Sequence, residues 1–315
     1  MTFWRLKMLN FTKNSDLSVS ETLSLLRRAH SIANHDVTVL HELDGMQMAS
    51  LFYEPSTRTR LSFASAMNAL GGSTIGFESS SSASVAKGES LADTIRVASQ
   101  YADLIVLRHP DISAPDIALA NSSVPLINAG NGADLHPTQT LADLMTIYEN
   151  KKTLSGLHLT FAGDLKYGRT VHSLVKELLR FGNNTFTFVS PDELRIPNEL
   201  RTKLTNTNTL FYEEQSIQTG IHSADIIYLT RIQTERFPQS LIKKSPTELT
   251  QVENFKPTDL DANTLLMHPL PRGTELPREF DVLPQAKYFD QVRFGKYARM
   301  ALIELLISKH TSNTK

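Results

Sequence analysis

Apolar positions along the chain follow two alternating patterns. Short apolar runs, typical of buried strands, are separated by stretches in which apolar residues recur every three or four positions, as in Leu91, Ile95 and Ala98. The second spacing predicts amphipathic helices. The predicted strands are residues 48–52, 73–77, 104–107, 124–127, 157–161, 185–189, 226–229 and 264–267. The predicted helices are residues 21–34, 59–70, 91–101, 138–149, 170–181 and 297–308.

The alternation of strands and helices occurs in both halves of the chain. A polar stretch that contains turn residues, 150–156, separates the two halves. We therefore expect an α/β fold of two domains, each with a central, mainly parallel sheet flanked by helices. The length of 315 residues agrees with two domains of ordinary size.

Composition narrows the possible functions. Hydrophobic residues are 40% and charged residues 21%, which excludes a disordered chain. No apolar run reaches the roughly 18 residues of a membrane span, and residues 1–11 lack the apolar segment of a signal peptide. The absence of cysteine excludes disulfides, thiolate nucleophiles and zinc–thiolate sites. A formal charge of −1 disfavours general binding to nucleic acid or membranes. We expect a cytoplasmic protein.

Several polar segments follow predicted strands, and the carboxyl ends of strands are where open α/β sheets bind ligands. After residues 48–52 the chain passes through Pro55 into Ser56, Thr57, Arg58 and Thr59 at a helix start. Free N–H groups, hydroxyls and a guanidinium at that position can bind a phosphate. A plain helix cap with surface arginines is the alternative.

Further cationic residues lie in a loop or at the ends of predicted strands and helices. Lys87 lies in a Ser- and Gly-containing loop, Arg108 ends a predicted strand, and Arg169 is near a helix start. Arg231 and Gln233 follow another strand. Each could bind an anion, and each taken alone is equally compatible with a solvated loop or a surface ion pair.

Two histidine segments complete the set. His136 and Gln139 lie three residues apart across a helix start, so both can face one ligand, although a capping histidine explains the pattern as well. Residues 267–273 form a Pro-rich turn whose carbonyls can accept hydrogen bonds from an amine, or which is purely structural. No P-loop, G-x-S-x-G or G-x-G-x-x-G motif is present. Together the segments indicate a site for small anions that uses no cofactor, metal or covalent nucleophile.

Three of these segments form a recognisable combination, Ser56-Thr57-Arg58-Thr59-Arg60, His136-Pro137-Thr138-Gln139 and His268-Pro269-Leu270-Pro271-Arg272. The combination resembles the carbamoyltransferase family, in its aspartate-type branch, over essentially the whole chain. The resemblance implies a carbamoyl phosphate-binding domain of residues 1–149 and 293–315, to which the C-terminal helix returns. It implies an aspartate-binding domain of residues 150–292.

The implied reaction transfers the carbamoyl group of carbamoyl phosphate to the amine of L-aspartate. The products are N-carbamoyl-L-aspartate and phosphate, early in de novo pyrimidine (UMP) biosynthesis. Ornithine carbamoyltransferases, the nearest alternative, carry a cysteine in the Pro-rich turn and a Ser-Met-Gly loop, whereas this chain has no cysteine and reads Thr230-Arg231-Ile232-Gln233. Another carbamoyl acceptor, or a catalytically silent assembly partner, is a further alternative.

The resemblance also implies roles for individual residues. The catalytic residues would be Arg58, Thr59, Arg108 and His136. Carbamoyl phosphate would be bound by Ser56, Thr57, Arg58, Thr59, Arg108, His136, Gln139, Leu270 and Pro271. Aspartate would be bound by Lys87, Arg169, Arg231 and Gln233. Glu54 would join Arg169 to Arg236.

The resemblance further implies an oligomer. Ser84 and Lys87 would reach into the site from a neighbouring subunit, which makes a homotrimer with shared active sites the active form. Whether regulatory chains or a dihydroorotase join a larger assembly stays open. No cofactor, metal, nucleic acid or membrane is expected as a partner.

Overall fold

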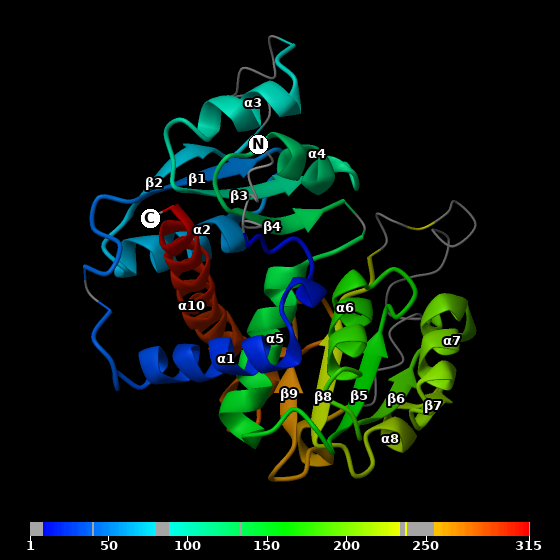
Figure 1. The fold of residues 1–315 in the computed structure, drawn as a ribbon. Coiled ribbons are helices and arrows are strands. Elements are labelled where there is room, and N and C mark those ends of the chain that lie inside the picture. The colour runs from blue at the N-terminus through cyan, green and yellow to red at the C-terminus, as the bar shows by residue number, and fades with distance from the viewer. Residues whose placement is uncertain are drawn as a thin grey trace. The chain divides into compact units, whose positions relative to one another are not determined.

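A computed structural model describes residues 9–39, 41–79, 88–132, 134–233, 237 and 255–314. The chain divides into two compact units, Met1–Met145 with Val292–Lys315 (unit 1) and Thr146–Gln291 (unit 2). Each unit contains one parallel sheet with helices packed against it (Figure 1), which confirms the predicted fold class. In the part of the chain that is described, no helix is both long and apolar enough to span a membrane.

Unit 1 is built on a four-stranded sheet of order β2-β1-β3-β4 in which every pairing is parallel. Its strands are β1 (Gln47–Phe52), β2 (Ser73–Phe77), β3 (Leu104–His109) and β4 (Leu126–Asn131). Its helices are η1 (Asn14–Asp16), α1 (Val19–Ala33), α2 (Thr57–Ala69), α3 (Leu91–Ala98) and α4 (Ala114–Asn121). Two further helices, α5 (Pro137–Lys151) and α10 (Tyr288–Thr314), run across the boundary between the units.

Helices cover both faces of this sheet (Figure 1). On the face of α3 and α4, Ile95 and Ala118 belong to one buried cluster with Ile105 and Leu107 of β3. On the face of α2, Phe63 is completely buried. A sheet buried on both faces requires strands that are apolar at nearly every position, and β1 and β3 have that composition.

Unit 2 contains a five-stranded parallel sheet of order β7-β6-β5-β8-β9. The strands are β5 (His158–Gly163), β6 (Thr185–Val189), β7 (Phe211–Glu214), β8 (Ile226–Thr230) and β9 (Leu265–Met267). The helices are α6 (Arg169–Leu178), η4 (Asp192–Leu194), α7 (Asn198–Asn206), α8 (Ile217–Gly220), η6 (Pro257–Asp259) and η7 (Arg278–Val282). Ile227, Leu266 and Phe280 share one buried cluster beneath the sheet, while Phe161 stacks on Phe188 with ring centroids 5.8 Å apart.

Most of the last helix, from Val292 onward, belongs to unit 1, as the resemblance implied. Arg299 of α10 is buried, and its Nη1 lies 3.1 Å from the hydroxyl of Ser62 in α2. Its Nη2 lies 3.4 Å from the carbonyl of Thr138 in α5, and its guanidinium covers the ring of Phe63. Burial lowers the pKa of Arg299 to about 10, against the opposing charge of Asp143. Through Arg299, α10 therefore contacts the amino-terminal half of α2 and the first turn of α5.

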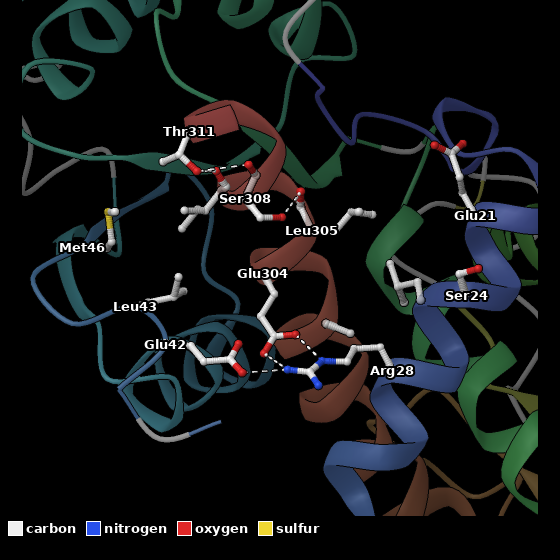
Figure 2. A pocket seen from close by; sticks show the side chains of 13 residues that line it. Glu21, Ser24, Arg28, Glu42, Leu43, Met46, Glu304, Leu305, Ser308 and Thr311 are labelled. Carbon is white, nitrogen blue, oxygen red and sulfur yellow. Dashed lines mark hydrogen bonds and ion pairs between the residues drawn. The ribbon is translucent and has the colours of Figure 1, made fainter. Parts of the chain in front are cut away.

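A pocket of about 490 Å³ lies in unit 1 between α1, α10 and residues 42–46. Figure 2 shows the guanidinium of Arg28 between two carboxylates on its wall. Arg28 donates to Glu304 at 2.8 and 3.0 Å and to Glu42 at 2.8 Å. At the rim, Lys309 Nζ lies 2.9 Å from Glu21 Oε1. These ion pairs attach α10 to α1 and to the segment before β1.

The Arg28→Met variant is expected to lose stability in a pH-dependent way. Burial raises the pKa of Glu304, Arg28 opposes that rise, and a hydrogen bond to Glu304 lowers the pKa of Glu42. Without Arg28 the two carboxylates repel when both are ionised, and this repulsion weakens at lower pH as Glu304, whose pKa is raised by burial, takes up a proton. The melting temperature should therefore fall by about 3 °C at pH 8, for a loss of about 1 kcal/mol, and by less at pH 5.

Thermal unfolding of this variant at both pH values measures the effect. The matched control is Arg27→Met on the same helix, because Arg27 is bonded only to Ser24 among the described residues. An equal loss at pH 5 and pH 8 would show that Arg28 acts by packing and not through its two carboxylates.

Candidate active site

Most of the predicted site segments follow neighbouring strands of a sheet. In unit 1, β1, β3 and β4 are adjacent. The segment that begins at Tyr53 follows β1, and the segments that begin at Arg108 and Asn128 include the last residues of β3 and β4. In unit 2, β5, β8 and β9 are adjacent, and the segments that begin at Asp164 and Arg231 and at His268 follow them. Parallel pairing thus gathers residues that are distant in sequence at one edge of each sheet.

The first turn of α2 presents the predicted phosphate cradle. Ser56 is the N-cap residue, yet its side chain makes no capping hydrogen bond. Thr57 and Arg58 are exposed, whereas Thr59 is buried. Among the described residues, no side chain bonds to the guanidinium of Arg58, and partial desolvation lowers the pKa of that guanidinium. The uncapped N–H groups, two hydroxyls and this cation form a positive helix terminus suited to an anion.

Arg108 is held at the end of β3 by three groups of unit 1. Its Nη2 lies 2.7 Å from Glu54 Oε1, and its Nη1 lies 3.2 Å from the carbonyl oxygen of Ala129. The same Nη1 lies 3.2 Å from Nε2 of His136. Because a guanidinium only donates, the ring accepts at Nε2 and a neutral His136 carries its proton on Nδ1. Arg108 and His136 are thus both buried donors beside one another.

The structure gives Glu54 a partner that the resemblance did not imply. Phe52 pairs with Arg108 across β1 and β3, so Glu54, two residues further on, emerges beside the arginine. The strand register therefore gives Glu54 a partner inside unit 1. Arg236, one of its two expected partners, lies outside the described residues.

The carboxyl-terminal half of β4 is shaped to receive Arg108. Gly130 has a φ of +127°, and a Cβ at this position would lie 3.0 Å from Nη1 of Arg108. Asn128 organises the end of this strand, because its Oδ1 accepts from the N–H of Gly130 at 2.8 Å and its Nδ2 donates to Asn131 Oδ1 at 3.0 Å. Glycine is required here for both its backbone conformation and the space that it leaves.

His136 and Gln139 meet at the start of α5, as their spacing predicts. Pro137 is the first helical residue, where its missing N–H costs no hydrogen bond. The N–H of Gln139 donates to the carbonyl of His136 at 3.0 Å, and Gln139 Nε2 donates to Asp143 Oδ1 at 2.8 Å. Asp143 therefore orients the side-chain amide of Gln139. The oxygen of that amide can still accept a hydrogen bond.

In unit 2 one carboxylate joins two of the predicted segments. Asp164 Oδ1 accepts from the N–H of Tyr167 at 2.9 Å, and its Oδ2 accepts from the N–H of Gln233 at 3.2 Å. Gln233 Nε2 donates to the carbonyl of Tyr167 at 3.3 Å. Arg169 begins α6 two residues beyond Tyr167. Hydrogen bonds thus join the segment that contains Gln233 to the segment that leads into Arg169.

The close approach of these two loops depends on a glycine. Gly163 pairs with Thr230 across β5 and β8, and a Cβ on Gly163 would lie 2.2 Å from the carbonyl oxygen of Thr230. Its φ of +117° is also unfavourable for other residues. Arg231 follows directly after Thr230, so this contact sets where its loop begins.

The Pro-rich turn after β9 presents Leu270 and Pro271 in a fixed conformation. His268 is buried, Leu270 is partly buried with a φ of +52°, and Pro271 is exposed. Ser84 and Lys87, by contrast, lie outside the described residues. No group of three or more His, Asp or Glu that could hold a metal ion occurs within the described ranges.

Five supporting residues were not found from the sequence: Asn128, Gly130, Asp143, Asp164 and Glu275. Asp143, Asp164 and Glu275 each hold a residue of a predicted segment by a hydrogen bond. Asn128 orders the backbone at Gly130, and Gly130 leaves space for Arg108. The only signal in the sequence is position, because Asn128 and Gly130 lie in the last four residues of β4 and Asp164 directly follows β5. Nothing local marks Glu275 or Asp143.

Two family models match the chain. Residues 9–149 match "Aspartate/ornithine carbamoyltransferase, carbamoyl-P binding domain", and residues 155–306 match "Aspartate/ornithine carbamoyltransferase, Asp/Orn binding domain". Among curated relatives, the aspartate carbamoyltransferase catalytic subunit of Clostridium kluyveri is 45% identical over 93% of this chain and 95% of the relative. That of Clostridium botulinum (strain Langeland) is 46% identical over 96% and 99%.

Solved structures that resemble this chain are aspartate transcarbamoylases as well. The catalytic subunit of M. jannaschii aspartate transcarbamoylase is 45% identical, with a TM-score of 0.88 over 96% of this chain and 99% of that one. Aspartate transcarbamoylase from Trypanosoma cruzi, in complex with carbamoyl phosphate and aspartate, is 35% identical, with a TM-score of 0.85 over 95% and 97%. With such identity over almost its full length, this chain belongs to the aspartate/ornithine carbamoyltransferase family.

Proposed function

We propose that the chain is an aspartate carbamoyltransferase, which transfers the carbamoyl group of carbamoyl phosphate to the amine of L-aspartate. The observation that carries the choice of acceptor is the loop after β8. It offers Arg231 and Gln233, a cation and an amide bonded to the loop after β5 that leads to Arg169. Such groups suit a dicarboxylate and would repel or leave unpaired the ammonium of an ornithine side chain.

The phosphate of carbamoyl phosphate binds at the start of α2. Uncapped N–H groups, that of Thr59 included, and the hydroxyls of Ser56 and Thr57 donate to its oxygens, and Arg58 supplies charge. Since the described residues leave the Arg58 side chain unbonded, the phosphate does not have to displace a competing carboxylate from it. The same contacts hold the leaving phosphate once its extra charge has developed.

The carbamoyl end is held by Arg108, His136 and Gln139. The neutral amine of aspartate attacks the carbamoyl carbon, and negative charge develops on the carbonyl oxygen. Thr59, Arg108 and the Nδ1–H of His136 stabilise that charge. Their positions are set beforehand by Glu54, Ala129 and the helix start, so little reorganisation is needed during the reaction.

The tetrahedral intermediate then collapses. The bond between the carbamoyl carbon and the phosphate oxygen breaks, and the leaving phosphate accepts the proton of the attacking amine, so no protein base is required. Carbamoyl aspartate and phosphate are the products. The rate enhancement then comes from orientation and from fixed positive charge.

Several further assignments belong to this proposal. Residues 1–149 and 293–315 serve carbamoyl phosphate and residues 150–292 serve aspartate. Lys87, with Ser84 beside it in sequence, completes the aspartate site from a neighbouring subunit of a homotrimer. The backbones of Leu270 and Pro271 accept hydrogen bonds from amino groups. We place the enzyme in the cytoplasm, at an early step toward pyrimidine nucleotides.

The test is a product assay with carbamoyl phosphate and two parallel acceptors, L-aspartate and L-ornithine. We expect carbamoyl aspartate and stoichiometric phosphate, with a preference for aspartate of at least about 100-fold in kcat/KM. Product from ornithine alone would overturn the assignment of Arg231 and Gln233 while leaving the phosphate half of the site intact. No product from either acceptor would favour a different acceptor or an assembly partner without catalysis.

A further inference from the structure

The turn that follows β9 is held by a buried chain of hydrogen bonds. His268 Nδ1 accepts from the backbone N–H of Leu270 at 2.8 Å. His268 Nε2 lies 3.0 Å from Glu275 Oε1, and that oxygen also accepts from the N–H of Gly273 at 2.7 Å. The side chains of His268 and Glu275 are 0% and 3% exposed. These hydrogen bonds therefore link the two sides of the turn, and the side chains that make them are shielded from solvent.

These contacts determine the protonation of the pair. Because Nδ1 of His268 accepts a backbone N–H, a neutral ring must carry its proton on Nε2, where it donates to Glu275. Burial lowers the pKa of His268, so the ring is neutral. Burial would raise the pKa of Glu275, but the hydrogen bonds from His268 and Gly273 outweigh it, and the carboxyl is ionised. The pair is a carboxylate accepting from a neutral imidazole.

The pair supports a backbone conformation that leucine seldom adopts. The φ of Leu270 is +52°, in the left-handed region that is unfavourable for a residue with a Cβ. The hydrogen bond from the Leu270 N–H to His268 offsets that cost. Glu275 fixes the imidazole that accepts this bond. Its carboxylate also lies against Gly273, where a Cβ would be 2.8 Å from Oε2.

We infer that Glu275 is a positioning residue that acts through His268 to orient the Leu270 backbone toward the amino group of the carbamoyl moiety. The inference rests on the proposed function, in which the Leu270 carbonyl accepts from that amino group. Neither Glu275 nor His268 touches the substrate in this scheme. Their effect is to select an acyl phosphate that carries N–H donors over one that does not.

The selection can be measured with two ligands that differ only at this group. Carbamoyl phosphate has an amino group where acetyl phosphate has a methyl group. For Glu275→Leu we expect the Kd of carbamoyl phosphate, measured by titration calorimetry, to rise about 10-fold, the effect of one lost hydrogen bond. The Kd of acetyl phosphate should stay within about twofold, because the α2 phosphate site is unchanged.

Three variants control the interpretation. Glu275→Gln keeps the acceptor oxygen and should restore carbamoyl phosphate affinity to within about threefold. Glu177→Leu replaces another buried glutamate of unit 2, one that bonds to Arg180, and should not alter the ratio of the two affinities. His268→Gln keeps a donor for Glu275 but removes the acceptor for the Leu270 N–H. It should show the same selective loss, and it tests the inference even where Glu275→Leu does not fold.

Equal weakening of both ligands, or no change in either, in Glu275→Leu and His268→Gln would overturn the inference. Failure of the proposed function would look different. In that case the wild-type protein would give no carbamoyl aspartate, whereas the calorimetric comparison of carbamoyl and acetyl phosphate would still report on the turn.

Discussion

Replacing Arg58 by alanine is expected to lower kcat about 10³-fold while leaving the melting temperature within a few degrees of wild type. The removed guanidinium would meet the phosphate both as substrate and as leaving group, where its negative charge is greatest. A fixed donor to charge that develops in the transition state contributes about 3–4 kcal/mol. The fold should not depend on it, because Arg58 is exposed and its side chain has no bonded partner in the described structure.

The chain offers a closely matched control two residues away. Arg60 lies on the same first turn of α2, but its Nη2 is 2.6 Å from Glu78 Oε2. An arginine neutralised by a carboxylate contributes little to a bound anion. Arg60→Ala should therefore keep kcat within about threefold of wild type. Comparable losses in the two variants, measured as initial rates of phosphate release, would remove Arg58 from the phosphate site.

Mixing two inactive variants is expected to restore activity. In the proposed trimer each site takes Arg58 from one subunit and Lys87 from its neighbour. Subunits with Arg58→Ala and subunits with Lys87→Ala should each be nearly inactive. After dissociation and reassembly of an equal mixture, about a quarter of the sites combine an intact Arg58 with an intact Lys87. Activity should rise to about a quarter of the wild-type value.

The reassembly experiment has its own control. Each variant is dissociated and reassembled alone, which should give no gain, and wild-type protein treated in the same way reports the recovery. No gain in the mixture, despite good recovery of wild type, would mean that every site is complete within one subunit. The assignment of Lys87 and Ser84 to a neighbour would then be wrong.

The architecture could be predicted largely from apolar spacing, and the omissions have physical causes. Strand β7 was missed because it is an edge strand with only partial burial, so its Phe-Tyr-Glu-Glu sequence carries no apolar run. Helix α7 was missed because only Leu200 and Leu204 are buried on it. Helix α10 begins at Tyr288, nine residues before the predicted start at Tyr297. Its early turns contain charged residues such as Arg293 and Lys296, so the apolar spacing did not predict them.

The candidate site was predictable where one short segment carries the chemistry. Residues 56–59 predict an anion site, because a helix start coincides there with hydroxyl and guanidinium side chains. The residues that orient the site could not be predicted in this way. Glu54 reaches Arg108 through strand register, and Arg299 reaches Ser62 from 237 positions away. Such partners become visible only when the sheet order and the helix packing are known.

The burial of Arg299 also sets an order of events during synthesis. Residues 146–291 are made without interruption, so all five strands of the second sheet can pair as soon as they leave the ribosome. The first sheet is made earlier, yet α10, which carries Arg299 to the starts of α2 and α5, is translated last. The contacts of Arg299 in unit 1 therefore form only after residues 146–291 have been synthesised, whereas an amino-terminal domain is usually complete first. The anion-binding edge of unit 1 is completed only when translation has passed residue 299.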